Sequence, residues 1–151
     1  MDKKELKVVA LRNGTVIDHI PSDKLFKVVS ILQLDKVPNQ ITIGNNLESK
    51  QLGTKGIVKI SDLYLDQKSI DKIALLAPAA NLNIIHDYMV KEKFPVRLPE
   101  EVTDIVRCSN PKCITNNQPV PTKFRILKKE PIQAQCCYCE RVLKEEEIRF
   151  K

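Results

Sequence analysis

Hydrophobic and polar positions along the first hundred residues follow two different periods. Apolar side chains at i, i+3, i+4 and i+7 predict an amphipathic helix with Ser22 as its N-cap; they are Leu25, Val28, Val29 and Leu32. The same spacing predicts a second helix that begins with Ser69 as its N-cap and ends at Pro78. Short β-branched and apolar runs around these helices predict strands at 6–11, 15–20, 41–43, 56–60 and 82–90.

The element order β-α-β-β-α-β predicts an α+β fold whose N-terminal domain is ferredoxin-like, with an antiparallel sheet and both helices on one face. The proline-containing segment 91–99 is expected to be a linker. Three short strand candidates follow it, at 102–107, 123–127 and 146–150. We therefore predict two domains, residues 1–99 and residues 100–151, of which the second is small and all-β.

The composition fits a folded globular chain, because 42% of the 151 residues are hydrophobic and 29% are charged. The longest uncharged run, from Ile73 to His86, is too short to span a bilayer. No apolar segment follows the charged N-terminus, so no signal peptide is expected. These features predict a soluble cytoplasmic protein with no membrane partner.

The formal net charge of +6 is unevenly distributed. Residues 1–99 hold 15 basic against 11 acidic side chains, and the remainder holds 10 against 8. Four thiolates around one Zn²⁺ would add a net charge of about −2 and cancel the C-terminal excess. The remaining basicity belongs to the N-terminal part, whereas a general polyanion binder usually shows a denser basic stripe. We therefore expect no nucleic-acid partner.

Cysteine spacing in the C-terminal part is typical of a metal site. Cys108 and Cys113 form a C-x4-C pair, Cys136 and Cys139 form a C-x2-C pair, and 22 residues separate the pairs. Two such pairs can hold one tetrahedral Zn²⁺, although a disulfide framework and an iron–sulfur cluster remain alternatives. Four thiolates leave no open coordination position, so one structural zinc per chain is predicted. Cys137 is left outside the ligand set.

The N-terminal part offers few candidates for chemistry. Asp18 and His19 are neighbours on a predicted strand, so their side chains should point to opposite faces and form no dyad. Lys59 lies in an apolar strand and Lys93 follows another. The lysines are either surface residues or, together with His19, converge on a phosphate. His86 is expected to be structural.

Several motifs together resemble the aspartate carbamoyltransferase regulatory chain. They are G-T-V-I-D-H-I-P at 14–21, I-T-I-G at 41–44, K-I at 59–60, A-P at 77–78, L-P-E at 98–100 and the cysteine pattern. The resemblance covers essentially the whole chain in order. It implies an allosteric domain followed by a zinc domain that contacts the catalytic chain, with no activity in this chain. It also implies regulatory homodimers that hold catalytic trimers together in a hetero-dodecamer.

The resemblance further implies a non-catalytic regulatory subunit of pyrimidine biosynthesis that binds CTP or ATP, with UTP as a further candidate ligand. Carried over by position, the family's nucleotide pocket falls on Val8, Val9, Ala10, Leu11, Asp18, His19, Ile57, Lys59, Asn83, Ile85, Tyr88, Val90 and Lys93. By the same resemblance, Lys93 and His19 face the triphosphate, Asp18 and Lys59 face the ribose, and the base lies near Leu11, Asn83 and 88–90. The sequence departs from the family pattern at Val9, where a glutamate is common, and at the uncharged Asn13.

Two other functional classes remain as alternatives. A zinc-ribbon nucleic-acid-binding protein would bind duplex or single strands in a salt-dependent manner and would not bind CTP. A domain that senses amino acids would bind aspartate rather than CTP in a calorimetric titration.

Overall fold

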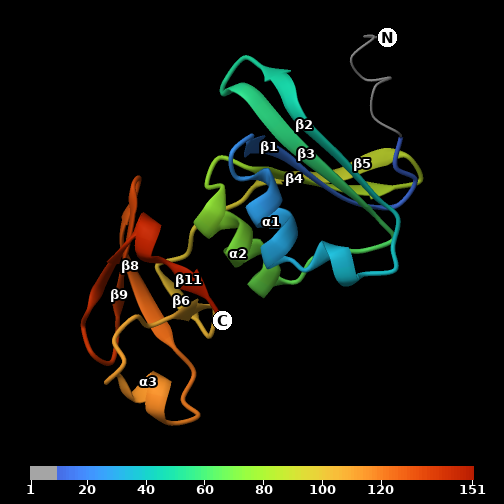
Figure 1. Ribbon diagram of the computed structural model, residues 1–151. Coiled ribbons are helices and arrows are strands. Elements are labelled where there is room, and N and C mark those ends of the chain that lie inside the picture. Colours follow the sequence, from blue (N-terminus) through green and yellow to red (C-terminus); the bar gives the residue numbers. More distant parts are fainter. Residues whose placement is uncertain (1–9) are drawn as a thin grey trace. The chain divides into compact units, whose positions relative to one another are not determined.

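The computed structural model describes residues 10–151 and divides the chain into two units, Met1–Arg97 and Leu98–Lys151 (Figure 1). The predicted strand at 6–11 lies mostly outside the described residues, and its last two residues, Ala10 and Leu11, are not in a strand. No helix among residues 10–151 is long and apolar enough to cross a membrane.

The N-terminal unit is a five-stranded antiparallel sheet with α1 and α2 on one face (Figure 1). Its elements are β1 (Gly14–Pro21), α1 (Leu25–Ile31), the 3₁₀-helix η2 (Leu34–Lys36), β2 (Ile41–Ser49), β3 (Gly53–Ser61), α2 (Gln67–Leu76), β4 (Asn81–His86) and β5 (Met89–Pro95). The strands lie in the order β2-β3-β1-β4-β5. The predicted ferredoxin-like order β-α-β-β-α-β is confirmed, and β5 is an additional edge strand.

The core of this unit lies on the face of the sheet that carries the helices. Ile17 of β1 pairs with Val58 of β3 and with Leu82 of β4, and all three side chains are fully buried. Leu25 and Val28 of α1 are also fully buried. Each such side chain contributes about 1.5–3 kcal/mol to folding by leaving water. No described helix covers the opposite face of the sheet, which we call the open face.

The predicted apolar stripe of the first helix is only partly confirmed. Val29 and Leu32 are half-buried, and the helix ends at Ile31. The cause is Gln33, whose left-handed backbone (φ 53°) breaks the helix. Leu34 in η2 is buried instead and provides the next apolar contact.

Both predicted N-caps are wrong. The turn between Pro21 and Lys24 delays α1 until Leu25, and the Ser22 hydroxyl donates a hydrogen bond to Thr54 Oγ1 (2.8 Å) instead. For α2 the cap is Asp66, whose Oδ1 accepts a hydrogen bond from the Ser69 N–H (2.8 Å). Ser69 is thus the third helical residue, because a carboxylate three residues earlier caps the helix.

The predicted strand at 82–90 is a hairpin, and the predicted linker at 91–99 contains most of β5. Asp87 and Tyr88 form the turn and have φ values of 49° and 65°. The Asp87 N–H donates to Asn13 Oδ1 (3.0 Å) and the Tyr88 N–H donates to the Arg12 carbonyl (2.9 Å). These distant contacts hold the turn, so local sequence patterns did not reveal it.

The C-terminal unit is a small β unit with one four-stranded sheet, ordered β10-β9-β8-β6, and one two-stranded sheet, β11-β7. Its elements are β6 (Glu101–Thr103), β7 (Val106–Arg107), α3 (Ile114–Asn117), β8 (Lys123–Lys129), β9 (Ile132–Cys136), β10 (Val142–Lys144), the 3₁₀-helix η3 (Glu145–Glu147) and β11 (Arg149–Phe150). Val102 pairs with Phe124, which pairs with Cys136, and all three are buried. This short core row therefore fixes the position of one cysteine of the metal motif.

The strand predictions for this unit need three corrections. The predicted strand at 102–107 is interrupted at Asp104, which has a φ of 58°. Of the predicted strand at 146–150, only Arg149 and Phe150 form a strand, β11, because residues 146 and 147 belong to the 3₁₀-helix η3. Strands β9 and β10 were not predicted.

Candidate metal centre and ligand pocket

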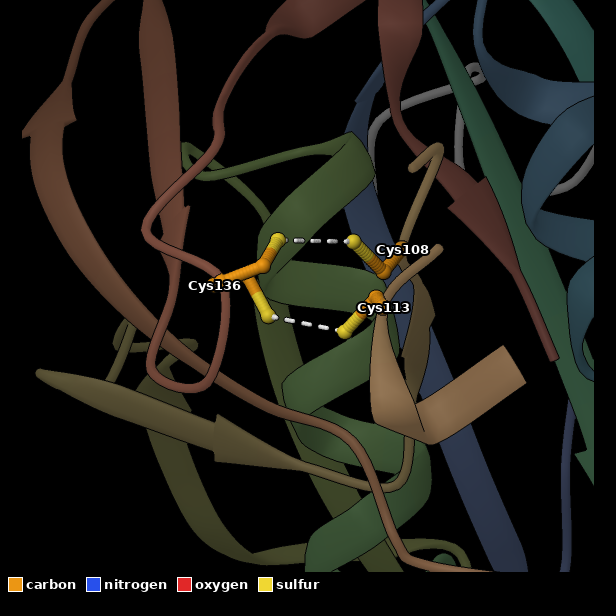
Figure 2. Close-up of side chains that lie close together, drawn as sticks. Cys108, Cys113 and Cys136 are labelled. Carbon is orange, nitrogen blue, oxygen red and sulfur yellow. Dashed lines mark hydrogen bonds between the residues drawn. The ribbon is translucent and has the colours of Figure 1, made fainter. Parts of the chain in front are cut away.

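Two loops of the C-terminal unit bring four cysteines together (Figure 2). Cys108 follows β7 and Cys113 precedes α3, whereas Cys136 ends β9 and Cys139 lies in the turn before β10. Their four sulfur atoms lie within 4.8 Å of one another. These are the four residues that the cysteine spacing selected.

The distances between the sulfur atoms fit a tetrahedral metal ion. Cys108 Sγ lies 3.5 Å from Cys139 Sγ, and Cys113 Sγ lies 3.8 Å from Cys136 Sγ. A tetrahedron with metal–sulfur bonds of about 2.3 Å has edges of about 3.8 Å. A disulfide would require about 2.05 Å, and all five cysteines are free thiols. Cys137 is exposed and lies outside the cluster.

Asparagine side chains shape the first cysteine loop. The Asn116 amide donates to the carbonyl oxygens of Cys108 (2.9 Å) and Asn110 (2.7 Å). The Asn117 amide donates to the carbonyl oxygen of Cys113 (2.8 Å). These bonds tie the backbone of the C-x4-C loop together and do not involve its two sulfur atoms.

The second cysteine loop is a tight turn closed by backbone hydrogen bonds. The Cys136 N–H donates to the Arg141 carbonyl (2.9 Å), and the Glu140 N–H donates to the Cys136 carbonyl (2.9 Å). Glu140 has a φ of 66°, which turns the chain back toward β10. The two-residue gap between Cys136 and Cys139 thus places both sulfurs on the inner side of one turn.

The environment of the thiols opposes ionisation at two ligand positions, Cys108 and Cys136, where burial raises the pKa, and favours it at Cys139. Burial, together with the neighbouring thiols, raises the pKa of Cys108 to about 12. At Cys139 partial burial opposes ionisation, but hydrogen bonds from Arg141, Asn110 and the neighbouring cysteines lower its pKa to about 7. Because metals bind thiolates, metal binding at this cluster must release protons.

The open face of the N-terminal sheet carries a row of polar side chains. Val16 of β1 pairs with Lys59 of β3 on one side and with Asn83 of β4 on the other, and Asn83 pairs with Lys93 of β5. Ile17, the next residue along β1, faces the helices, so side chains in the row of Val16 face away from them. Strand register therefore brings three of the predicted pocket residues into one line.

Two features show that this row is not ordinary surface. Asn83 Oδ1 is buried and has no hydrogen-bond partner among residues 10–151. Partial burial lowers the pKa of Lys59 below its usual value, and this effect exceeds the opposing attraction of Asp18. A buried unpaired acceptor and a partly desolvated ammonium group both favour a polar ligand.

A pocket of about 190 Å³ lies beside Lys59. Its lining includes four residues of the predicted nucleotide site: Ala10, Leu11, Lys59 and Tyr88. Arg12, Gln40, Thr42 and Ser61 complete the lining and were not predicted. The pairing of Thr42 with Lys59, and the position of Ser61 two residues after Lys59 on the same strand face, are signals that strand alternation could have given.

The other predicted pocket residues lie outside this lining. Asp18, His19, Ile57, Asn83, Ile85, Val90 and Lys93 come from β1, β3, β4 and β5. Val8 and Val9 lie outside the described residues.

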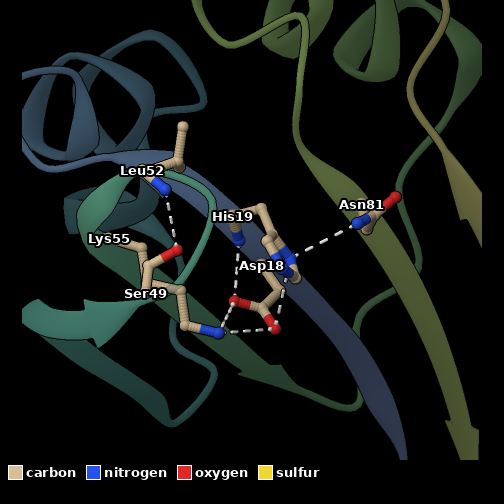
Figure 3. A network of polar contacts seen from close by, with 6 residues as sticks. All are labelled: Asp18, His19, Ser49, Leu52, Lys55 and Asn81. Atoms are coloured by element: carbon tan, nitrogen blue, oxygen red, sulfur yellow. Dashed lines mark hydrogen bonds and ion pairs between the residues drawn. The ribbon is translucent and has the colours of Figure 1, made fainter.

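A polar network surrounds the end of β1 (Figure 3). Lys55 Nζ lies 2.9 Å from Asp18 Oδ1, which also accepts a hydrogen bond from the His19 N–H (2.7 Å). His19 Nδ1 lies 3.6 Å from Asp18 Oδ2 and 3.3 Å from Asn81 Nδ2. The prediction that Asp18 and His19 point apart is wrong, because His19 has a φ of 60° and the register of β1 with β3 shifts there.

Family comparisons agree with the two units. Residues 6–97 match the model of the aspartate carbamoyltransferase regulatory chain, allosteric domain, and residues 100–149 match that of the metal binding domain. The chain is 52% identical over 150 residues to the aspartate carbamoyltransferase regulatory chain of Porphyromonas gingivalis, covering 99% of each chain. It is 53% identical over 147 residues to that of Bacteroides thetaiotaomicron (97% of this chain, 96% of the relative). It is 50% identical over 146 residues to that of Pyrococcus abyssi (95% and 96%).

Proposed function

The chain belongs to the family of aspartate carbamoyltransferase regulatory chains, and from that premise we propose that it binds a nucleoside triphosphate, CTP or ATP, on the open face of its allosteric domain. It is a regulatory, non-catalytic subunit with an allosteric domain and a metal-binding domain. The observation that carries the proposal is the row of Lys59, Asn83 and Lys93, with its buried and unpaired amide oxygen.

The chemistry of this face fits a nucleotide. In the proposed complex, Lys93 and His19 bind the triphosphate, because cationic and N–H donors match its many acceptor oxygens. Asp18 and Lys59 bind the ribose region. The Asn83 amide oxygen, unpaired in the described chain, would accept a hydrogen bond from an amino group of the base. UTP is a third candidate ligand because it shares the triphosphate and the ribose.

We also propose that the metal of the C-terminal unit is one structural Zn²⁺ per chain, held by Cys108, Cys113, Cys136 and Cys139. The sulfur distances support this assignment, since they match the edges of a single tetrahedron. Four thiolates would fill the coordination shell of the ion, so it would organise the two loops and perform no catalysis. The small core of this unit makes such a contribution to folding important.

The proposed partner is the catalytic chain of aspartate carbamoyltransferase, which the metal-binding domain would contact. Regulatory homodimers would join catalytic trimers in a hetero-dodecamer in the cytoplasm. Nucleotide binding would regulate the enzyme if the nucleotide has different affinities for two quaternary states, a difference typically worth about 1–3 kcal/mol. The nucleotide would then change activity without touching the active site.

Co-purification with the catalytic chain tests this function. The assembled enzyme should show an aspartate saturation curve that shifts when CTP is added, and the catalytic chain alone should show no shift. Failure of the two chains to assemble, or an identical curve with and without CTP and ATP, would contradict the proposal. The alternative of a nucleic-acid-binding protein is not favoured by the family matches.

A further inference from the structure

His19 occupies an unusual position at the end of β1. Its backbone lies in the left-handed region (φ 60°), and its side chain is about one-fifth exposed. A non-glycine residue in this conformation is uncommon and often marks a functional site. The conformation aims the imidazole toward β4, where Asn81 begins the strand (Figure 3).

The contact between Asn81 and His19 defines which ring nitrogen is an acceptor. Asn81 Nδ2 lies 3.3 Å from His19 Nδ1. An amide nitrogen carries two hydrogens and accepts no hydrogen bond, so Nδ1 must be the acceptor in this pair. A neutral imidazole has only one N–H, which therefore lies on Nε2.

The charged groups near the ring do not reverse this arrangement. Asp18 is the neighbouring carboxylate, but its Oδ2 lies 3.6 Å from His19 Nδ1, beyond normal hydrogen-bond distance. The carboxylate is already bound by Lys55 (2.9 and 3.2 Å) and by the backbone N–H of His19 (2.7 Å). Among residues 10–151, no hydrogen bond occupies His19 Nε2.

We propose that Asn81 is a positioning residue that holds the proton of neutral His19 on Nε2, so that the ring presents an N–H donor to a phosphate group. This inference rests on the proposed function. Phosphate oxygens are acceptors, so a neutral histidine can bind them through the nitrogen that carries hydrogen and not through the other. Asn81 itself does not touch the ligand.

The first test observes the tautomer directly in the ligand-free full-length chain. Two-bond ¹H–¹⁵N spectra at about pH 8, where an unperturbed imidazole is neutral, distinguish Nε2–H from Nδ1–H. The chain has two histidines, so a His86→Gln variant assigns the signals. We expect His19 to carry its proton on Nε2 in the parent and to move it to Nδ1 in Asn81→Asp, since a carboxylate only accepts. An Nδ1–H tautomer in the parent would overturn the proposal.

The second test asks whether Asn81 acts through His19. The affinity for CTP is measured by calorimetry in the parent, Asn81→Leu, His19→Gln and the double variant. We expect Asn81→Leu to weaken CTP binding about threefold to tenfold in the parent and to have no effect in the His19→Gln background. Cytidine, which lacks phosphates, should bind the parent and Asn81→Leu equally.

The outcomes separate this inference from the proposed function. Equal losses of CTP affinity in both backgrounds would show that Asn81 acts independently of His19, and would overturn the positioning role. If the parent binds no CTP or ATP at all, the proposed function fails, and the spectra of the parent then decide the tautomer assignment alone.

Discussion

Lys59 of β3 and Asn83 of β4 both pair with Val16 of β1, so the two polar side chains flank one buried valine on the open face of the sheet. Lys93 extends the row through its pairing with Asn83. The residues come from strands that are distant in sequence, and a shift of one residue in any strand would turn its side chain to the other face. The proposed ligand site therefore depends on the register of the whole sheet.

Replacing Lys59 should separate ligand binding from stability. We expect Lys59→Met to weaken CTP binding by about 1.5–3 kcal/mol, through loss of a charge-assisted contact. The ligand-free variant should be at least as stable as the parent, because burial already disfavours the ammonium form. Calorimetry and urea unfolding measure both effects. Lys50→Met, an exposed change in the β2–β3 turn, is the control and should alter neither.

The same residue gives a pH dependence of stability. The pKa of Lys59 is lowered from its ordinary 10.5 in the folded state, so the unfolded chain binds this proton more tightly. The free energy of unfolding of the parent should therefore rise relative to Lys59→Met as pH increases from the lowered pKa toward 10.5. A parent that loses stability relative to the variant over this range would contradict the assigned environment.

Removing the cap of α2 should destabilise the N-terminal unit. Asp66→Ala is expected to cost about 1 kcal/mol near neutral pH, since the Ser69 N–H loses its acceptor. The hydrogen bond from Ser69 lowers the pKa of Asp66 below 3.8, so its contribution is present above that pH and is lost as pH falls through the lowered pKa. Unfolding curves at neutral and acidic pH measure this. Asp66→Asn should retain most of the cap without its pH dependence.

A charge introduced into the core between α1 and the sheet should lower the free energy of unfolding far more than a charge introduced on the exposed side of α1. Val28 is fully buried and Phe26, on the same helix, is 66% exposed. Val28→Asp should therefore lower the free energy of unfolding by more than about 3 kcal/mol, whereas Phe26→Asp should change it by about 0.5 kcal/mol or less. Similar thermal transitions for both variants would mean that α1 does not pack on the sheet as described.

Loss of the metal should affect the C-terminal unit and leave the ligand site intact. We expect Cys113→Ala, or a mercurial that captures the thiolates, to unfold that unit and to release the catalytic chain. CTP binding by the freed chain should persist, because the open face belongs to the N-terminal unit. Metal analysis should find about one zinc per parent chain.

Two variants control this experiment. Cys137→Ala should retain both metal and assembly, because Cys137 is exposed and outside the cluster. A protein that loses its metal on Cys137→Ala and keeps it on Cys136→Ala would show that the ligand set is wrong. If removal of the metal abolishes CTP binding while the regulatory and catalytic chains are still assembled, the separation of the two units is contradicted.

Periodicity was sufficient to predict that both helices are present and that the order is ferredoxin-like, because each helix buries part of its apolar face. It could not predict the β4–β5 hairpin, whose turn donates backbone N–H groups to the Arg12 carbonyl and to the Asn13 side chain, both distant in sequence. The helix caps were also missed, because a serine looks favourable locally while Asp66 makes the actual hydrogen bond.

At the candidate sites, too, the sequence predicted what depends on local spacing and missed what depends on contacts between distant segments. Cysteine spacing selected the four clustered sulfurs, because each close pair occupies one turn. The ligand pocket was harder to predict, because it depends on contacts between distant segments: Thr42 pairs with Lys59, and the Ser61 N–H donates to the Gln40 carbonyl. The structure explains why the 14–21 motif begins with a glycine. Gly14 has a φ of 141°, and the nearby Ile60 carbonyl leaves no room for a side chain.

A calorimetric titration of CTP into the full-length chain tests the central claim most directly. The parent is compared with a variant in which Lys59 and Lys93, at the two ends of the polar row, are both alanine. We predict that CTP binds the parent and that the double variant loses about 10-fold to 100-fold in affinity for each charge-assisted contact removed. An unchanged dissociation constant in the folded double variant would contradict the assignment of the nucleotide to the open face.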